Sequence, residues 1–415
     1  MDGKRIIRIA SWALYDLANQ FFALNIIALY FVRWVTIEQN VSELVYAAVY
    51  ALSTLVVALL MPWLGSLADA RRSYRLFLTL CTLVSVAGTF CLSITRHAGP
   101  ALFWFALANF GCQAAVTFYN ALLPSVTPPG RIGLLSGLGK LAGYLGAIVC
   151  LLLSRPVFER AGYAAVFQLT GWLFLVFSLP CLLLVPDPQR PEPLPSWRAV
   201  LARCSFGQEM RQVGQRIAQL QELAGMRAFF KAVFFGLAGV QVVMLFMTVY
   251  VTRVFGLSAA RVNVLLAIGT LFAMLGSVAA GMIGDRVGHK STLAIVLGSW
   301  IPCLLIASAG GPSSQWVLAA LGGLNLGATW VSARSLALTL MPADRVGEMF
   351  GLYNLTAVAA GVAGPVYWGL WRVVLVKFDA VGYRLSLAAL VPLIVIGLWF
   401  LRRVPQADSA INPRK

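Results

Sequence analysis

Three ionisable side chains, Asp16, Lys140 and Arg334, lie deep inside long apolar stretches of the sequence. Each is about eight or nine residues from the charged residue or proline that marks one end of its stretch, which is about 12–14 Å along a helix. Because an ionised group in an apolar environment is costly, each needs an opposite charge, water or a functional role. Asp16 and Lys140 have opposite charges at similar depth and could form an ion pair if their two stretches lie side by side. Arg334 would then remain as an unbalanced cation.

Arg334 can be interpreted in two ways. A guanidinium offers two parallel donors to a carboxylate, so Arg334, together with Lys140, could bind an anionic group of a substrate. Alternatively, Arg334 could bind backbone carbonyl groups at helix ends and have only a structural role. Asn325, Thr329 and Ser332 share one face of the same predicted helix, and Arg334 points roughly opposite.

Asp16 is the only carboxylate placed deep in a predicted span, which makes it the candidate for proton coupling. A neighbouring Lys140 would keep Asp16 ionised and oppose its protonation. Glu348 is placed at the start of another apolar stretch and is expected to be exposed to solvent.

The fourth predicted span carries a stripe of polar side chains. Asn109, Gln113 and Asn120 are spaced so that they lie on one face of a helix. A polar stripe in a membrane helix should face the protein interior or a water-filled path, where it could bind a substrate. Hydrogen bonding between helices is the alternative interpretation. Asn19 and Gln241, in the first and seventh spans, are further substrate-binding candidates.

The composition excludes most soluble classes of protein and indicates an integral membrane protein. Of the 415 residues, 60% are hydrophobic and 11% are charged, whereas soluble domains carry about 25% charged residues. Despite the net charge of +17, no nucleic-acid partner is expected. Neither a P-loop nor an arrangement of nucleophile, base and acid is present, so neither an ATP-driven motor nor an enzyme is expected. No cofactor and no metal ion are expected, since the seven cysteines form no CxxC pair.

Apolar runs separated by turn signals predict an all-α membrane protein with twelve transmembrane helices in two pseudo-symmetric six-helix bundles. The predicted spans are 10–35, 44–67, 76–95, 101–123, 132–154, 163–185, 229–253, 262–284, 291–309, 315–340, 347–371 and 382–401. The bundles are predicted at 1–185 and 229–415, the second with a short cytoplasmic tail. The linker between them, 186–228, begins with a proline-rich spacer. An amphipathic helix follows at about 210–224 and is expected to lie on the cytoplasmic membrane surface.

The distribution of Lys and Arg residues predicts the orientation. With the amino terminus inside, about 21 of the 32 cations lie on the cytoplasmic side and about nine on the outer side. Both termini are therefore expected in the cytoplasm.

A short motif occurs twice, near the ends of the second and eighth predicted spans. Gly65 and Asp69 in the first copy are each 216 residues before Gly281 and Asp285 in the second. Matched motifs about half a chain apart indicate two duplicated halves.

We expect this motif to act as a cytoplasmic gate. Glycine permits close helix packing, and the aspartate can accept hydrogen bonds from the amino terminus of a neighbouring helix. The aspartates can also pair with the nearby cations Arg71, Arg72 and Arg286. Such a cluster could hold one conformation and break in another. The alternative is a solvated turn that only sets the topology.

The twelve predicted spans, the long central loop and the two G-x-x-x-D loops resemble the major facilitator superfamily. Further segments narrow the resemblance to the vacuole-effluxer branch, named for the autophagy-related amino-acid exporters of fungal vacuoles. These segments are WALYDLANQFF (12–22), FYNALLP (118–124), SGLGKLAGYLG (136–146), SARSLALTLMP (332–342) and EMFGLYNL (348–355). The resemblance implies that the first and fifth spans pack together, which would bring Asp16 to Lys140. It also implies that spans one, four, seven and ten line a central cavity.

We therefore predict a secondary active transporter that moves a small polar or anionic solute by alternating access, with two halves rocking around a midplane site. The resemblance implies export of a small solute, most simply an amino acid or similar carboxylate, by a monomer with a coupling proton or other ion. A transporter of lipids or lysolipids is one alternative, and a transport-inactive membrane receptor or scaffold is another. The expected location is the bacterial cytoplasmic (inner) membrane, or the vacuolar membrane in a eukaryote.

Overall fold

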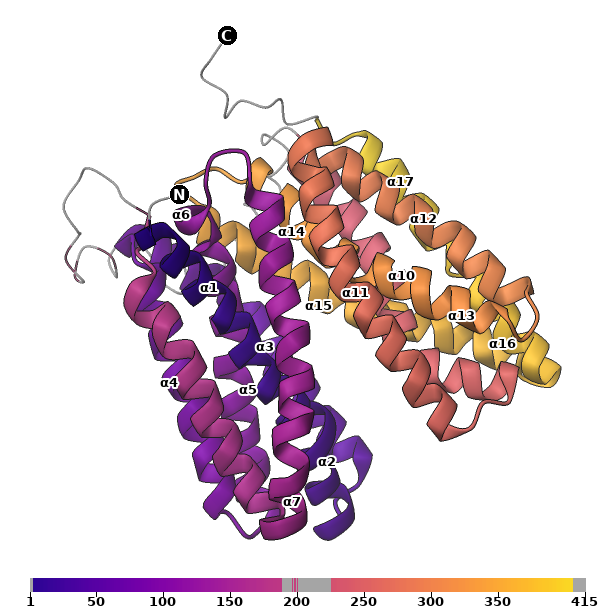
Figure 1. Cartoon of the computed structure of the whole chain (residues 1–415), viewed down its shortest axis with the longest axis horizontal. Coiled ribbons are helices and arrows are strands. Elements are labelled where there is room, and N and C mark those ends of the chain that lie inside the picture. Colours follow the sequence, from indigo (N-terminus) through magenta and orange to yellow (C-terminus); the bar gives the residue numbers. More distant parts are fainter. Residues whose placement is uncertain (1–2, 189–195, 197, 199, 201–224, 406–415) are drawn as a thin grey trace. The chain divides into compact units, whose positions relative to one another are not determined.

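The computed structural model describes residues 3–188, 196, 198, 200 and 225–405, and these residues form helices and no strands (Figure 1). The predicted amphipathic helix and most of the proline-rich spacer lie outside the described residues. The helices before the linker are α1 (Gly3–Phe22), η1 (Ala23–Leu29), α2 (Tyr30–Arg33), η2 (Trp34–Glu38), α3 (Glu43–Arg71), α4 (Tyr74–Ile94), α5 (Ala98–Ala121), α6 (Leu123–Val126) and α7 (Ile132–Leu184). The helices after it are α10 (Met226–Phe255), α11 (Ala259–Val287), α12 (His289–Ala309), α13 (Ser314–Val317), η3 (Leu318–Gly322), α14 (Gly323–Leu340), α15 (Val346–Val374), η4 (Val376–Phe378), α16 (Asp379–Ala388) and α17 (Val391–Arg402).

In the described part of the chain, 11 helical stretches are long and apolar enough to cross a membrane. One of them, α7, has 53 residues, which is about 80 Å at 1.5 Å per residue and more than twice the thickness of a hydrocarbon core. Gly162 interrupts α7 with φ 72° and ψ −165°, a backbone conformation that glycine adopts readily. The length of α7 therefore corresponds to two spans, and the predicted all-α fold of membrane-spanning helices is confirmed.

Local sequence explains where several helices begin and end. The Ser42 side chain accepts a hydrogen bond from the Val45 amide and so caps the start of α3. Arg72 ends α3 in the left-handed conformation, with φ 61°. Gly256 ends α10 in the same conformation at less conformational cost.

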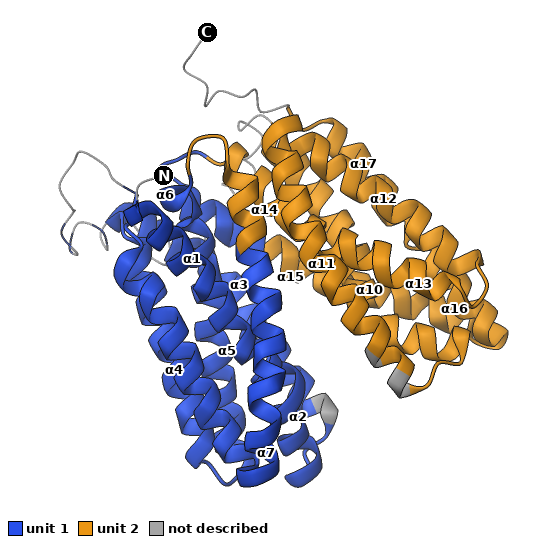
Figure 2. Ribbon diagram, viewed as in Figure 1, with its two compact units in different colours: residues 1–127, 139–211, 342–354 blue, residues 128–138, 212–341, 355–415 orange. Residues whose placement is uncertain are grey.

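The chain divides into two compact units (Figure 2). Unit 1 comprises Met1–Thr127, Gly139–Arg211 and Pro342–Asn354, and unit 2 comprises Pro128–Leu138, Gln212–Met341 and Leu355–Lys415. The first turns of α7 belong to unit 2 although the rest of α7 belongs to unit 1, and the first turns of α15 belong to unit 1 although its remainder belongs to unit 2. Each unit therefore contains the start of one helix that continues in the other. The boundaries of the two six-helix bundles stay a prediction.

In unit 1, a row of glycines on α7 allows α1 to approach closely. A Cβ atom on Gly146 would lie 2.7 Å from the carbonyl oxygen of Leu17, and one on Gly139 would lie 2.6 Å from the ring of Trp12. Small residues at a helix contact let two backbones pack directly against each other. This contact places the middle of α1 beside the part of α7 that carries Lys140.

Aromatic stacking fixes the orientation of α1 in unit 1. The Trp12 and Tyr119 rings stack with centroids 4.5 Å apart, and the Tyr15 ring lies 5.1 Å from Tyr119 on α5. The Trp12 Nε1–H donates to the Tyr119 carbonyl at 3.1 Å, and the Tyr15 hydroxyl bonds to Thr82 of α4 at 2.6 Å. Because all three rings are buried, the segment of α1 that precedes and includes Asp16 is held against two neighbouring helices.

In unit 2, α11 and α14 pack with their backbones in contact. Added Cβ atoms on Gly276, Gly323 and Gly327 would lie 2.1, 2.2 and 2.0 Å from carbonyl oxygens of the opposite helix. Helix α12 also packs against α14, and α10 against α17. Unit 2 therefore uses the same close glycine packing as unit 1.

We predict that Gly146→Ala destabilises the protein, because the new methyl group would collide with the backbone of α1 rather than with a movable side chain. Overpacking of this kind costs about 1–3 kcal/mol. Gly369→Ala in α15 is the matched control, because nothing lies within 4 Å of its added Cβ and alanine favours a helix by about 1 kcal/mol. Thermal unfolding of the detergent-solubilised protein should show a lower midpoint for Gly146→Ala alone. Equal midpoints for the two variants would contradict this packing.

Candidate functional site

Asp16 and Lys140 form an ion pair within unit 1, as the implied packing of the first and fifth spans predicted. The Lys140 Nζ atom lies 3.3 Å from Oδ2 and 3.5 Å from Oδ1 of Asp16. The Asp16 side chain is 4% exposed and the Lys140 side chain is 27% exposed. A carboxyl group thus lies almost fully inside the helix bundle beside a lysine side chain that is partly exposed.

The contact between the two charges is loose. Hydrogen bonds between an ammonium and a carboxylate are usually 2.7–2.9 Å long. Although Oδ2 is the atom nearer to Lys140, it takes part in no hydrogen bond among the described residues. The pair is therefore mainly a Coulomb contact, and the Asp16 carboxylate keeps unused acceptor capacity.

The three residues of the polar stripe on α5 lie in different environments. Asn109 is fully buried and donates to the hydroxyls of Ser53 at 2.8 Å and Thr54 at 3.2 Å, both on α3. These bonds agree with the interhelical alternative. Gln113 is half-buried, and Asn120 is buried.

The remaining amide candidates lie on α1 and α10. Asn19 accepts a hydrogen bond from the Cys112 thiol of α5, with a sulfur–oxygen distance of 2.9 Å. Gln241 is half-buried in unit 2 beside Gly361 of α15. Asn19 is thus one turn beyond Asp16 on α1, whereas Gln241 belongs to the other compact unit.

Arg334 is fixed by the start of α7 within unit 2. Its Nε donates to the Ser136 hydroxyl at 2.8 Å, and one terminal nitrogen donates to the Ser136 carbonyl at 2.5 Å. The residue is 4% exposed. This arrangement agrees with the structural interpretation, in which the guanidinium binds a backbone carbonyl near a helix end.

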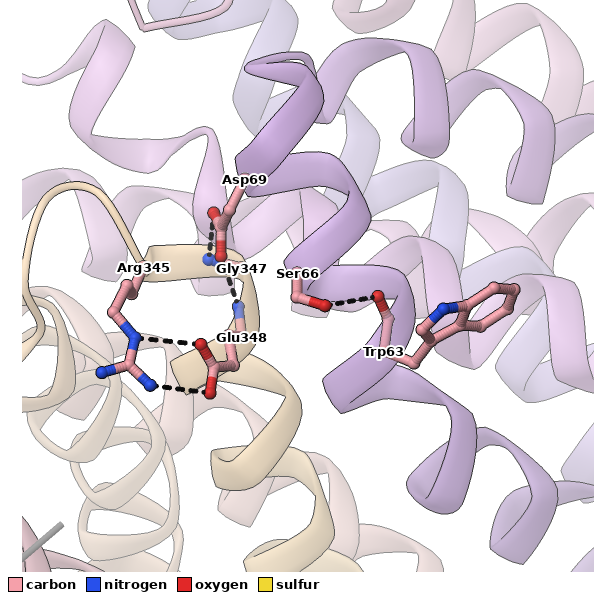
Figure 3. Close-up of polar contacts among 6 residues, drawn as sticks. All are labelled: Trp63, Ser66, Asp69, Arg345, Gly347 and Glu348. Atoms are coloured by element: carbon pink, nitrogen blue, oxygen red, sulfur yellow. Dashed lines mark hydrogen bonds and ion pairs between the residues drawn. The ribbon is translucent and has the colours of Figure 1, made fainter. Parts of the chain in front are cut away.

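The first copy of the repeated motif holds the start of α15 in unit 1 (Figure 3). The Asp69 carboxylate accepts hydrogen bonds from the amides of Gly347 at 2.9 Å and Glu348 at 2.8 Å. It also accepts a bond from the Tyr74 hydroxyl at 2.5 Å. Asp69 lies within the last turns of α3 rather than in a loop, and it is buried. The expected contact between this aspartate and the amino terminus of a helix is present.

Glu348 differs from the sequence expectation. It is 4% exposed rather than solvated, and its carboxylate accepts bonds from the Arg345 guanidinium at 2.9 and 3.0 Å (Figure 3). These bonds raise the pKa of Arg345. The expectation was wrong because the sequence does not reveal that the start of α15 is covered by α3.

The second copy of the motif holds the start of α7 in unit 2. The Asp285 carboxylate accepts hydrogen bonds from the amides of Gly133 at 2.7 Å and Leu134 at 2.8 Å. The His289 Nε2 atom lies 3.8 Å from Asp285 Oδ1. Arg286 is exposed in the last turn of α11. We call the contacts of Asp69 and Asp285 with these helix starts the two carboxylate latches.

Both latches depend on glycine contacts. A Cβ atom on Gly65 would lie 2.5 Å from the carbonyl oxygen of Gly347, and one on Gly281 would lie 2.2 Å from that of Gly133. The helices cross so closely that each aspartate, one turn further on, reaches the free amides of the opposite helix. Pairing of the aspartates with Arg71 and Arg72 stays a prediction.

Sequence reasoning missed several residues of these contacts. Helices α7 and α15 each begin with a G-x-x-x-G spacing, at 133–137 and 347–351, and this spacing is a recognisable signal for close helix packing. The hydrogen bond between Asn354 of α15 and Thr117 of α5 was also missed, as was the buried cluster around Asn25. Asn25 lies in a π-helical turn and bonds to Ser154 and Thr170. No sequence signal pairs these residues in advance.

Comparison with known protein families identifies the superfamily of this chain. The model described as Major Facilitator Superfamily matches residues 17–365 and 229–415. The chain belongs to the Major Facilitator Superfamily. It is therefore a multi-pass membrane protein of a transporter family and not an enzyme.

Two bacterial proteins that are similar to this chain are described as uncharacterised. An uncharacterised MFS-type transporter of Bacillus subtilis, YxiO, is 25% identical over 422 residues, which cover 96% of this chain and 95% of that protein. An uncharacterised protein of Aquifex aeolicus is 24% identical over 375 residues, with 89% and 90% covered.

Solved structures show the same fold at low sequence identity. A bacterial homologue of the iron transporter ferroportin has a TM-score of 0.71 at 14% identity, with 96% of this chain and 98% of that chain covered. The human organic anion transporter MFSD10 (TETRAN) has a TM-score of 0.69 at 14% identity, with 97% and 100% covered. The proton:xylose symporter XylE has a TM-score of 0.69 at 14% identity, with 98% and 96% covered. These likenesses concern the fold alone.

We predict that the two latches of this superfamily member contribute unequally to stability. In Asp69→Asn, one acceptor becomes an amide that faces a backbone N–H, which costs about 1–3 kcal/mol. Asp285→Asn should cost less, because Asp285 accepts two of these bonds and Asp69 accepts three.

The midpoint of thermal unfolding in detergent ranks these variants. Asp344→Asn, at an exposed position near the first latch, is the control and should match the unmodified protein. A larger loss for Asp285→Asn than for Asp69→Asn would contradict the ranking.

Proposed function

We propose that this chain is a secondary transporter for small polar solutes that carry a carboxylate, with amino acids as the first candidates. The supporting observation is the Asp16–Lys140 ion pair. It places one carboxylate and one partly accessible ammonium group inside a bundle of membrane-spanning helices. An ionised pair at such a position is costly to maintain, and intramembrane charges in transporters generally belong to substrate or ion paths.

The proposal includes the direction of transport and the branch of the superfamily. The segments that resemble the vacuole-effluxer branch favour export, and the bacterial relatives favour the bacterial cytoplasmic membrane. The distribution of Lys and Arg favours cytoplasmic termini, and the protein would act as a monomer. Within unit 1, the substrate path would include Asn19, Gln113 and Asn120 together with the ion pair. In unit 2, Gln241 is a separate candidate, and Arg334 would lie outside direct substrate contact because Ser136 already accepts its hydrogen bonds.

The two carboxylate latches support alternating access. Each one joins a buried or partly buried aspartate to two free amides at a helix start. When a latch opens, the aspartate and the amides must find water or new partners, so each latch stabilises one conformation. In this proposal, substrate binding in one state and release in the other depend on the opening of these contacts.

We predict that purified protein in proteoliposomes transports L-alanine or another amino acid and that Lys140→Ala lowers the rate at least tenfold, because the carboxylate loses its cationic partner. Lys377→Ala is the matched control, since Lys377 is an exposed lysine in η4 of unit 2. The measurement is uptake of radiolabelled solute, with lysophosphatidylcholine flipping assayed in parallel. Lysolipid movement without amino-acid movement would favour the lipid alternative, and no movement of either would favour a receptor or scaffold.

The role of Asp16 in proton coupling can be tested separately. If Asp16 exchanges a proton during the cycle, Asp16→Asn should abolish transport driven by an imposed pH gradient. Exchange of solute at equal concentrations on both sides should continue at saturating substrate. Gradient-driven transport by Asp16→Asn at the rate of the unmodified protein would exclude Asp16 as the coupling residue.

A further inference from the structure

We infer that the Asp16–Lys140 pair is an exchange site for zwitterions, in which the ammonium group of the ligand takes the place of Lys140 at Asp16 and its carboxylate binds Lys140. This inference rests on the proposed transport function and narrows the substrate class to molecules that carry one positive and one negative charge.

The first argument is the unused bonding capacity of Asp16. An ionised carboxylate can accept about four hydrogen bonds, and buried polar groups are normally satisfied. Asp16 is 3% exposed, yet Oδ1 has one contact at 3.5 Å and Oδ2 has no hydrogen bond among the described residues. A ligand ammonium group, with three donors, would supply the missing bonds.

The second argument is the difference in mobility between the two partners. Asp16 follows Trp12 and Tyr15, whose rings are buried and stacked on Tyr119, so its position is fixed. Lys140 is 27% exposed and has a flexible four-carbon side chain. Lys140 can therefore move away from Asp16 and remain close enough to bind the other end of a short ligand.

Compensation of the buried charges favours a ligand that carries both signs. The pair is neutral as a whole, and an uncompensated charge in a low-dielectric environment is strongly unfavourable. A ligand with only a carboxylate would bind Lys140 and leave Asp16 unpaired, and one with only an ammonium group would leave Lys140 unpaired. A zwitterion replaces one ion pair by two and leaves neither charge alone.

The backbone of α7 packs closely against the Asp16 carboxylate. Gly143 lies one turn beyond Lys140 on α7, and an added Cβ there would be 3.3 Å from the Asp16 carboxyl carbon. Glycine at this position therefore allows the α7 backbone itself to lie against the carboxylate.

The test compares ligands that differ only in charge. Two sets are used: L-alanine, propanoate and ethylamine, and L-phenylalanine, 3-phenylpropanoate and 2-phenylethylamine. Inhibition of radiolabelled L-alanine or L-phenylalanine uptake into proteoliposomes gives the apparent affinity of each. For the unmodified protein, we expect each amino acid to bind at least tenfold more tightly than either singly charged analogue of its set.

The variants should change this preference in opposite directions. In Asp16→Asn, the carboxylate-only ligand should bind as tightly as the amino acid, because Lys140 is then an unpaired cation. In Lys140→Gln, the amine should gain in the same way, because Asp16 is then an unpaired anion. A merely structural role of the pair would lower the affinity for all three ligands together. The charge-swapped variant Asp16→Lys/Lys140→Asp keeps the pair and should keep the preference for zwitterions, which guards against misfolding of the single variants.

The outcomes separate this inference from the proposed function. If propanoate and L-alanine are transported equally well by the unmodified protein, the carboxylate transporter stands and the exchange site is wrong. If the three ligands of a set lose affinity in parallel in both single variants, the exchange site is also wrong. If no amino acid or carboxylate is transported, the proposed function fails and the exchange site fails with it.

Discussion

Close approach of helix backbones at glycine is the constraint on which the other contacts depend. A carboxylate on a short aspartate side chain reaches backbone amides only when the two helices nearly touch. Gly65 and Gly281 provide this contact for the latches, because a Cβ atom at either position would overlap the opposite backbone. Gly146 does the same for the contact between α1 and α7 that brings Asp16 to Lys140. Small residues therefore determine which polar groups can meet in these apolar helices.

The structure joins the two compact units through helices rather than through loops alone. Helix α7 begins in unit 2, where Asp285 and Arg334 bind its first turns, and continues in unit 1. Helix α15 begins in unit 1, where Asp69 binds its first amides, and continues in unit 2. The pattern is reciprocal, as expected for a chain with a duplicated motif. In both cases, the unit that holds the helix start contributes the aspartate.

The sequence predicted those features that follow from the chemical type and spacing of nearby residues. Membrane-length apolar runs predicted the helices, and the repeated glycine–aspartate spacing predicted contact with a helix start. The Asp16–Lys140 pair followed from opposite charges at similar depth together with the span packing that the family resemblance implied. Contacts could not be predicted where the partner residue is distant in the sequence and has no distinctive side chain. Arg334 bonds to Ser136, 198 residues away, and neither the serine nor its carbonyl differs in sequence from many others. From the sequence, Glu348 was expected to be solvated, but in the structure α3 covers it.

One turn of α7 carries two contacts with different partners. Ser136, bound by Arg334, and Lys140, paired with Asp16, are four residues apart and so stand above one another on the helix. The boundary between the two units falls between them, after Leu138. A rigid turn cannot shift at one of these residues without shifting at the other. The division of this turn between two compact units therefore follows from its polar contacts: a residue of unit 2 holds Ser136, and a residue of unit 1 pairs with Lys140.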